Sequence, residues 1–277
     1  MNWTDKVVLI TGGSAGLGRA VAQRFASRGA SLVIVARGEE RLEQAAEALR
    51  HAGAQVTPLV ADVTEDEQVD MIIARTLDRY GRLDVLVNNV GRSARGLVTE
   101  TTVDDFCNLF ETNFWPAVRC TRAAIGHLEK TAGSLVNIGS LASKSVGFHL
   151  GAYPATKFAL AAYTAQLRLE LVSKGIHVLH VCSGPIARDD AGNRYNVQAE
   201  HLPESSHQPG AGVRLAPLSA DYVARRVLEA VERRRAELVV PGKAKLLFGL
   251  SQLFPRWGDI ILRKQFDKAG KKRRIQP

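Results

Sequence analysis

Short apolar runs alternate along this chain with segments in which apolar residues recur every three or four positions. The runs are rich in β-branched residues and end at turn-forming residues, which is typical of strands, whereas the longer spacing indicates amphipathic helices. Strands are predicted at residues 6–11, 31–36, 55–60, 84–88, 134–138, 176–182 and 237–240. Helices are predicted at residues 17–28, 39–51, 66–80, 103–130, 152–173 and 220–234.

The predicted strands are apolar throughout instead of at every second position, which suits a parallel sheet covered on both faces. Strands that alternate with helices in this way predict an α/β fold, a doubly wound, mostly parallel seven-stranded sheet of the Rossmann type. We expect one domain over residues 1–242, with helices on both faces of the sheet.

One segment, residues 188–214, breaks this alternation with closely spaced Gly, Pro, Asp and Asn residues. Such a stretch can be an ordinary surface loop. Because it is long and follows the sixth strand, at the edge of the sheet where ligands bind in such folds, we favour a mobile insertion that covers a substrate.

The charge of the chain is concentrated at its C-terminal end. The 277 residues carry a formal net charge of +9, but residues 243–277 alone hold ten Lys and Arg against two Asp and Glu. The rest of the chain is nearly neutral, so a basic face for nucleic acid is not indicated. Because the chain has neither a run of about 18 apolar residues nor an N-terminal leader pattern, we expect an intracellular, cytoplasmic protein.

The C-terminal extension, residues 243–277, combines this charge with apolar residues at three- and four-residue intervals. They are Leu246, Leu250, Leu253, Trp257 and Ile260, interrupted by Pro255. Amphipathic helices of this kind have two interpretations. They can pack on the body or on a second subunit and extend a substrate pocket. Alternatively, the apolar face and the basic residues can attach the protein peripherally to an anionic membrane.

Cysteine and histidine spacing does not indicate a metal site. The three cysteines, Cys107, Cys120 and Cys182, form no Cys-x-x-Cys pair, and the seven histidines show no ligand spacing. We therefore expect neither a disulfide framework nor a bound metal, and we interpret the cysteines as buried thiols.

A glycine-rich turn joins the first strand to the first helix. It reads Thr11-Gly12-Gly13-Ser14-Ala15-Gly16-Leu17-Gly18. At this position the backbone N–H groups and the helix dipole can hold a pyrophosphate, and glycines let the backbone come close to it. The strand before the turn and the helix after it are what a dinucleotide-binding site requires.

Tyr153 and Lys157 lie four residues apart in a predicted helix, so both side chains should stack on one face. A free tyrosine holds its proton until about pH 10, and a nearby ammonium group that favours the phenolate would lower that pKa. The pair is therefore a candidate proton donor. By itself, the spacing also fits a solvated pair on a helix surface.

Together, the G-x-x-x-G-x-G spacing and the Tyr-x-x-x-Lys pair resemble the classical short-chain dehydrogenase/reductase family, over about residues 5–240. The resemblance implies a catalytic tetrad of Asn113, Ser140, Tyr153 and Lys157. Ser140 would orient the substrate carbonyl, and Tyr153 would donate a proton to its oxygen. Lys157 would lower the pKa of Tyr153 and hold the nicotinamide ribose, while Asn113 would position a water that connects Lys157 to solvent.

The resemblance also implies a set of cofactor contacts. Besides Tyr153 and Lys157, they are Thr11, Gly12, Ser14, Ala15, Gly16, Leu17 and Gly18 in the turn, Asp62 and Val63 at the adenine, Asn89, Val90 and Gly91 after the fourth strand, and Ser183, Gly184 and Ile186 along the nicotinamide. Three positions differ from the family pattern. Val90 replaces the usual alanine, Ser183 replaces a proline, and Arg188 replaces a threonine that commonly contacts the carboxamide.

The end of the second strand, Val35-Ala36-Arg37-Gly38, carries no carboxylate. An acidic residue there would bind the ribose 2′-hydroxyl of NAD, whereas Arg37 can pair with the 2′-phosphate of NADP. We therefore expect NADP(H) to be preferred, with NAD(H) possible. In the alternative interpretation, Arg37 is solvated or paired with Glu39 or Glu40.

These features predict an NADP(H)-dependent carbonyl reductase that transfers a hydride to a ketone or aldehyde. The segments expected to line its pocket are residues 92–97, 141–150 and 188–214. Val146, Phe148 and Leu150 favour an apolar, lipid- or steroid-like small-molecule substrate, although Phe148 also fits ordinary packing. Because family members usually pair through helices flanking the sheet, we expect a homodimer or homotetramer. The alternative is a nucleotide-sensing or scaffold protein that keeps the fold without turnover.

Overall fold

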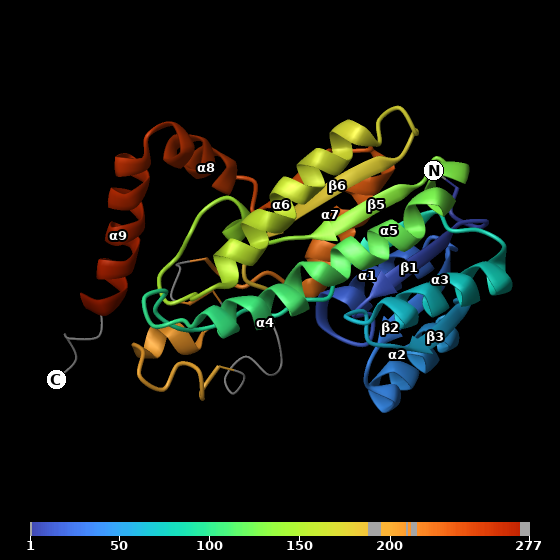
Figure 1. Cartoon of the computed structure of the whole chain (residues 1–277), viewed down its shortest axis with the longest axis horizontal. Coiled ribbons are helices and arrows are strands. Elements are labelled where there is room, and N and C mark those ends of the chain that lie inside the picture. Colours follow the sequence, from blue (N-terminus) through green and yellow to red (C-terminus); the bar gives the residue numbers. More distant parts are fainter. Residues whose placement is uncertain (1, 188–194, 209, 212–214, 272–277) are drawn as a thin grey trace.

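The structure, a computed structural model, describes residues 2–187, 195–208, 210–211 and 215–271, and of residues 265–271 it describes the backbone alone. A single sheet organises the fold (Figure 1). Its strands are Val7–Thr11 (β1), Ser31–Ala36 (β2), Val56–Val60 (β3), Val85–Asn88 (β4), Ser134–Ile138 (β5), His177–Ser183 (β6) and Glu237–Val240 (β7). Each lies within one residue of its predicted bounds.

The strand order is β3-β2-β1-β4-β5-β6-β7, and all neighbouring strands are parallel. The predicted doubly wound sheet is therefore confirmed. From β1 the chain moves outward to β3, returns to β4 beside β1, and then continues in the opposite direction to β7. The reversal between β1 and β4 opens a crevice at the carboxyl ends of these strands, where ligands bind in folds of this type.

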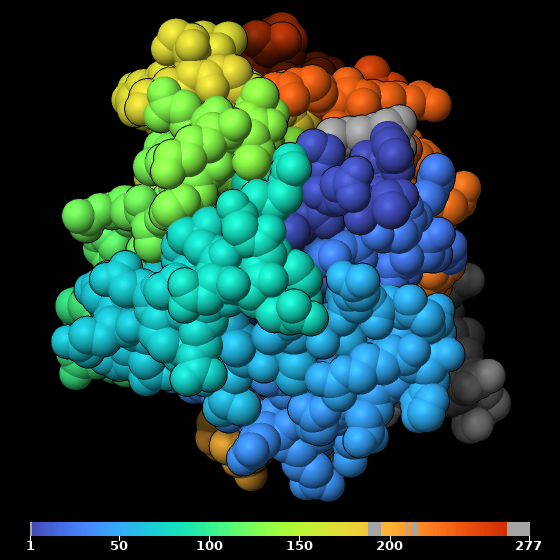
Figure 2. All heavy atoms as spheres, turned by 90° about the vertical axis from the view of Figure 1, so that its right-hand side faces the viewer, coloured from blue at the N-terminus to red at the C-terminus, as the bar shows by residue number. Residues whose placement is uncertain are grey.

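Helices cover both faces of the sheet (Figure 1). They are Gly16–Ala26 (α1), Glu39–His51 (α2), Asp66–Tyr80 (α3), Val103–Asn113 (α4), Trp115–Lys130 (α5), Tyr153–Glu170 (α6), Ala220–Glu232 (α7), Ala244–Leu253 (α8) and Pro255–Lys271 (α9). Apolar residues of α1, α2 and α7 form a core on one face, and those of α3, α5 and α6 form a core on the other. Figure 2 shows the side of the molecule on which the first third of the chain, blue to cyan, forms much of the surface.

The predicted helix over residues 103–130 is wrong in one respect, because it is broken into α4 and α5 at Phe114. Pro116 explains the break: it has no N–H to donate, and its ring would clash with a carbonyl of the preceding turn. It is tolerated in the first turn of α5. The break places Asn113 at the C-terminal end of α4, next to the crevice.

Only part of the insertion predicted at residues 188–214 lies among the described residues. Residues 195–208 form turns and a short 3-10 helix, Glu204–His207. Arg188 lies outside the described residues.

The C-terminal extension forms two helices, with Pro255 beginning the second. Helix α8 packs on the sheet through Phe248, which contacts Cys182 and Val239. Helix α9 packs against α8 and extends away from the body (Figure 1). The predicted apolar face is not buried within this chain: Leu246 is 83% exposed, and Leu250, Leu253, Trp257 and Ile260 are also exposed. Within the described part of the chain, no helix has the length and apolar character needed to span a bilayer.

The cysteines differ from the expectation in one case. Cys120 and Cys182 are buried, as predicted, but Cys107 is exposed on α4. Burial raises the pKa of each buried thiol to about 12.

Candidate active site

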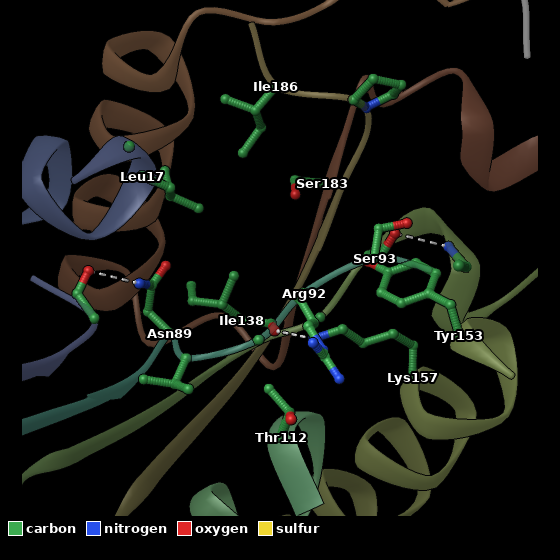
Figure 3. A pocket seen from close by; sticks show the side chains of 18 of the residues that line it. Leu17, Asn89, Arg92, Ser93, Thr112, Ile138, Tyr153, Lys157, Ser183 and Ile186 are labelled. Carbon is green, nitrogen blue, oxygen red and sulfur yellow. Dashed lines mark hydrogen bonds between the residues drawn. The ribbon is translucent and has the colours of Figure 1, made fainter. Parts of the chain in front are cut away.

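A cavity of about 1590 Å³ opens at the carboxyl ends of the strands. Its walls include residues that follow six of them: Gly12, Arg37, Asp62, Asn89, Gly139 and Gly184. Sites for one small molecule usually measure about 300–1,000 Å³, so this cavity can hold a dinucleotide and a second ligand. Figure 3 shows Leu17 and Asn89 on one side of the space and Tyr153 and Lys157 on the other.

The glycine turn meets the requirements of a tight phosphate-binding loop. Gly12 has a φ of +67°, which favours glycine, and a Cβ atom at Gly18 would lie 2.1 Å from the carbonyl oxygen of Gly12. Helix α1 begins at Gly16, and Ala15 before it provides no side-chain hydrogen bond to the first turn. Because no side chain caps this helix, the N–H groups at the start of α1 are available to an anionic ligand.

Two residues predicted to contact the cofactor, Thr11 and Gly18, do not line the cavity, whereas the other predicted turn residues do. Thr11 instead joins two loops. Its Oγ1 accepts from the backbone N of Asn89 at 3.0 Å, and Nδ2 of Asn89 donates to the carbonyl oxygens of Thr11 and Gly12 at 3.0 and 3.2 Å. These contacts fix the ends of β1 and β4 relative to each other.

Two arginines line the cavity near the end of β2: Arg37 directly follows the strand, and Arg41 is in the first turn of α2. The Arg37 side chain is 77% exposed, and its Nη1 donates to Oδ2 of Asp62 at 3.4 Å. Among the described residues its ion-pair partner is therefore Asp62, not the glutamates that follow it in sequence. The sequence analysis missed Arg41, although its position one helical turn after Arg37 was a usable signal.

Asp62 and Val63 line the same part of the cavity. Burial acts to raise the pKa of Asp62, but hydrogen bonds from Thr64 and the charge of Arg37 outweigh it and lower that pKa. Both the backbone N and Oγ1 of Thr64 donate to Oδ1 of Asp62, at 3.0 and 2.8 Å. Asp62 is therefore a charged acceptor at neutral pH.

Tyr153 and Lys157 occupy the first turns of α6, where the four-residue spacing puts both on the cavity side (Figure 3). Lys157 is only 4% exposed, and its Nζ lies 5.9 Å from the centre of the Tyr153 ring. The same Nζ donates to the carbonyl oxygen of Ile138, at the end of β5, at 3.1 Å. That hydrogen bond fixes the ammonium group next to the phenol.

The pKa values of this pair differ from the expectation that the lysine dominates. Burial raises the pKa of Tyr153, while hydrogen bonding with Ser140 acts to lower it. Burial lowers the pKa of Lys157 to about 8. In the protein alone, desolvation of Tyr153 therefore outweighs its hydrogen bond with Ser140, and the phenol keeps its proton at neutral pH.

Ser140 lies directly after β5 and lines the cavity beside Tyr153. Its Oγ accepts from the backbone N of Ala142 at 3.1 Å, which caps a short 3-10 helix, Leu141–Ser143. This cap fixes the position of Oγ and leaves its O–H free to donate.

Asn113 does not line the cavity, in contrast to the other three residues of the predicted tetrad. It is 1% exposed and binds protein groups. Its Oδ1 accepts from the backbone N of Arg92 at 2.7 Å, and its Nδ2 donates to the carbonyl oxygen of Arg92 and to Oγ1 of Thr156 at 2.8 and 3.1 Å. Asn113 thus holds the loop after β4 against the start of α6.

The residues predicted along the nicotinamide, Ser183, Gly184 and Ile186, all line the cavity. So do Asn89, Val90 and Gly91, and a Cβ atom at Gly91 would lie 3.3 Å from Nζ of Lys157. Glycine at this position therefore leaves room beside the lysine.

Several apolar residues line the cavity away from the glycine turn. Val146 and Leu150 line it as predicted, whereas Phe148 does not. Tyr195, within the 188–214 segment expected to line the pocket, also lines the cavity, as do Leu247, Phe248 and Leu262 of the C-terminal helices. Leu215, directly after that segment, was not among the predicted lining residues.

Comparison with known proteins is consistent across sequence and structure. A family model described as short chain dehydrogenase matches residues 6–198. The uncharacterized oxidoreductase YxnA of Bacillus subtilis (strain 168) is 33% identical over 262 residues, which cover 94% of this chain and 72% of that protein. The 11-beta-hydroxysteroid dehydrogenase 1A of Arabidopsis thaliana is 31% identical over 272 residues, covering 94% and 76%. The structure of an actinorhodin polyketide ketoreductase variant with NADPH superimposes with a TM-score of 0.77 at 30% identity, covering 87% of this chain and 97% of that one.

Proposed function

Because the chain belongs to the short-chain dehydrogenase family and is an oxidoreductase, we propose that it reduces an apolar ketone or aldehyde to an alcohol with NADPH. One observation supports the proposal most directly. Ser140, Tyr153 and Lys157 line the same cavity as the glycine turn, two arginines and several apolar residues. A reductase of this kind needs the cofactor and the substrate in one continuous space.

The residues present fit a nicotinamide dinucleotide. The uncapped start of α1 and the close approach of Gly12 and Gly18 suit a pyrophosphate, and the carboxylate of Asp62 suits the adenine amino group. Gly91 after β4, Ser183 at the end of β6 and Gly184 after it would hold the nicotinamide half. When bound, the nicotinamide supplies the hydride.

The proton for the substrate oxygen comes from Tyr153 in this proposal. Its raised pKa keeps the phenol protonated at neutral pH, so it can donate. The Ser140 hydroxyl orients the carbonyl, and the Lys157 ammonium, fixed by the Ile138 carbonyl, stabilises the phenolate left behind. Asn113 acts through the backbone of Arg92, which it holds beside Lys157.

The preference for NADPH rests on Arg37 and Arg41. Both guanidinium groups face the cavity near the end of β2, where no carboxylate follows the strand directly. A 2′-phosphate would compete with Asp62 for Arg37, and this exposed pair is weak enough to exchange. The related polyketide ketoreductase was solved with NADPH, which supports the same choice.

The preference for an apolar substrate rests on the lining of the inner part of the cavity. Leu141, Val146, Leu150, Leu247, Phe248 and Leu262 contribute to it. Two relatives are named for polyketide reduction and for hydroxysteroid oxidation, which are both reactions of largely apolar molecules.

The decisive assay follows the loss of NADPH absorbance with a panel of cyclic, aromatic and aliphatic ketones and aldehydes, with NADH in parallel. Turnover of apolar ketones with NADPH supports the proposal. Binding of NADPH without turnover of any carbonyl compound would instead favour a nucleotide-sensing or scaffold role.

We further propose that α8 and α9 contact an anionic membrane surface peripherally. Leu246, Leu253 and Trp257 are 83%, 75% and 63% exposed, and the same extension carries ten basic and two acidic residues. Anionic lipid headgroups complement this charge, whereas the nearly neutral body of a second copy does not. Because Leu247, Phe248 and Leu262 of the same helices line the cavity, an apolar substrate would enter it from the lipid side.

The formation of a homodimer or homotetramer through the helices that flank the sheet stays a prediction, and light scattering of the purified protein tests it.

A further inference from the structure

Arg95, in the loop after β4, is a buried arginine that the sequence motifs do not include. It is only 7% exposed. Its Nε donates to the carbonyl oxygen of Ser206 at 2.6 Å, and its Nη2 donates to that of Gln208 at 2.9 Å. Its Nη1 donates to Oγ of Ser93 and to the carbonyl oxygen of Ala94, at 2.8 and 2.7 Å. Arg95 thus fastens the 195–208 segment, more than a hundred positions further along the chain, through that segment's backbone.

The same segment has a second attachment, to the loop before α6. Ser206 is fully buried, and its Oγ lies 3.1 Å from Nδ1 of His149, in the loop before α6. Gln198 adds a third contact, because its Oε1 accepts from the backbone N of Arg95 at 3.2 Å. Residues 195–208 are therefore held between the loop after β4 and the loop that leads to Tyr153.

Tyr195 begins this segment, and Arg95 stacks on it. The guanidinium carbon of Arg95 lies 3.7 Å from the centre of the Tyr195 ring, which is within the range of a cation–π interaction. Tyr195 is 9% exposed and lines the same cavity as Tyr153. It lies close enough to act electrostatically on Tyr153, raising its pKa, while Arg95 acts to lower it. The contact between Ser206 and His149, four residues before Tyr153, also places the segment that carries this ring next to the start of α6.

We propose that Arg95 is a positioning residue that holds the Tyr195 ring as a wall of the carbonyl-binding end of the cavity, where the ring contacts flat apolar substituents of the substrate. This inference deepens the proposed function and rests on it. The pair determines specificity: it favours ketones with an aromatic or fused-ring substituent over small aliphatic ketones.

Lysine cannot replace Arg95 in this arrangement. The planar guanidinium stacks on a ring with its face while its edge donates to several carbonyls, and a lysine ammonium has neither the plane nor the fixed donor directions. Arg95→Lys therefore keeps the charge and removes the geometry. Arg225→Lys is the matched control, because Arg225 stacks on Tyr222 at 5.5 Å on the exposed side of α7, away from the cavity.

The test measures binding of 1-tetralone, an aromatic bicyclic ketone, to the full chain by isothermal titration calorimetry, with and without NADP⁺, so that no turnover is needed. We expect Tyr195→Ala and Arg95→Lys each to weaken binding about tenfold, and the double variant to bind about as weakly as either single variant. Tyr195→Phe and Arg225→Lys should remain within about twofold of the original protein. Because Tyr195→Ala leaves the donors of Arg95 in place, it reports on the ring even if Arg95→Lys unfolds locally.

Three results would overturn the inference: no binding of 1-tetralone to the unaltered chain, unchanged affinity in Tyr195→Ala, or additive losses in the double variant. NADPH-dependent turnover, measured separately, tells this failure from failure of the proposed function. If the protein turns over ketones but Tyr195→Ala does not change the binding of 1-tetralone, only the proposed role of Arg95 and Tyr195 is rejected. If the variants bind as expected but no ketone is turned over, only the reductase function is rejected. In reduction assays, Tyr195→Ala and Arg95→Lys should each raise KM for 1-tetralone more than KM for cyclohexanone.

Discussion

Lys157 donates a hydrogen bond to the carbonyl oxygen of Ile138 at 3.1 Å, and its Nζ lies 5.9 Å from the centre of the Tyr153 ring. Helix α6 and strand β5 therefore cooperate to hold a buried cation beside a phenol. Burying this cation has a cost for folding, since it lowers the pKa of Lys157 to about 8. This destabilising cation lies at the position where the proposed reaction needs positive charge.

We expect Lys157→Met to stabilise the protein near pH 7 while it removes activity. The pKa of Lys157 is lower in the folded than in the unfolded chain, so the unfolded chain binds more protons between about pH 8 and 10.5. The free energy of unfolding of the original protein should therefore rise with pH over that window. At pH 7 the variant should be more stable by on the order of 3 kcal/mol, and this difference should shrink as the pH rises through the window. Urea unfolding at several pH values measures this, with the exposed Lys130→Met as control. A pH-independent difference would contradict the buried-cation account.

The two arginines near the end of β2 should control cofactor choice. We expect Arg37→Gln and Arg41→Gln each to lower kcat/KM for NADPH about tenfold, with little change for NADH, because each removes one partner of the 2′-phosphate. Ala36→Asp should lower the preference for NADPH further by repelling that phosphate. Arg50→Gln, at the far end of α2, is the control. Equal losses with both cofactors in the arginine variants would reject this account.

Two glycine-to-alanine substitutions should differ in their effect on NADPH binding. A Cβ atom at Gly18 would lie 2.1 Å from the carbonyl oxygen of Gly12, so Gly18→Ala should distort the turn and abolish NADPH binding. Gly126 is inside α5 with nothing within 4 Å of such an atom. Gly126→Ala should therefore stabilise the protein by about 1 kcal/mol without affecting NADPH binding. Fluorescence titration and thermal unfolding test both, and normal NADPH affinity in Gly18→Ala would refute the close approach.

The C-terminal helices should bind anionic vesicles. We expect the full chain to sediment with vesicles containing phosphatidylserine but not with phosphatidylcholine alone, and less so at high salt. Leu246→Glu and Trp257→Glu should each abolish this binding, whereas Val172→Glu, at an equally exposed apolar residue beyond α6, should not. If the original chain stays in the supernatant and Leu246→Glu changes its mass in light scattering, the apolar face instead contacts a second copy.

The sequence predicted the sheet well because its determinants are local. Runs of β-branched residues set each strand, and the glycine turn set the first crossover, so the strand bounds agree within one residue. The error at residues 103–130 arose because the apolar spacing continues across Phe114 while Pro116 interrupts the hydrogen bonds. Periodicity describes side-chain faces and does not register a missing N–H.

Only those residues of the candidate site that belong to a local sequence motif could be predicted. Tyr153 and Lys157 share one helix, so their spacing placed them together. Asn89, Ser140 and Ser183 lie at or just beyond the carboxyl ends of strands that end at the same edge. The partnership of Arg95 with Tyr195 depends on chain segments a hundred residues apart, for which one sequence gives no signal. The burial of Tyr153 could not be predicted from the sequence either. This burial raises the pKa of Tyr153, whereas the lysine alone was expected to lower it.

The central claim is that the Tyr153 phenol donates the proton to the substrate oxygen, and Tyr153→Phe tests it most directly, because the variant keeps the ring and loses only the hydroxyl. NADPH affinity and single-turnover oxidation of bound NADPH by an excess of ketone should be measured on both proteins. We predict that affinity stays within about twofold while the turnover rate falls at least about a hundredfold. A Tyr153→Phe protein that binds NADPH normally and reduces the ketone at the original rate would contradict the claim.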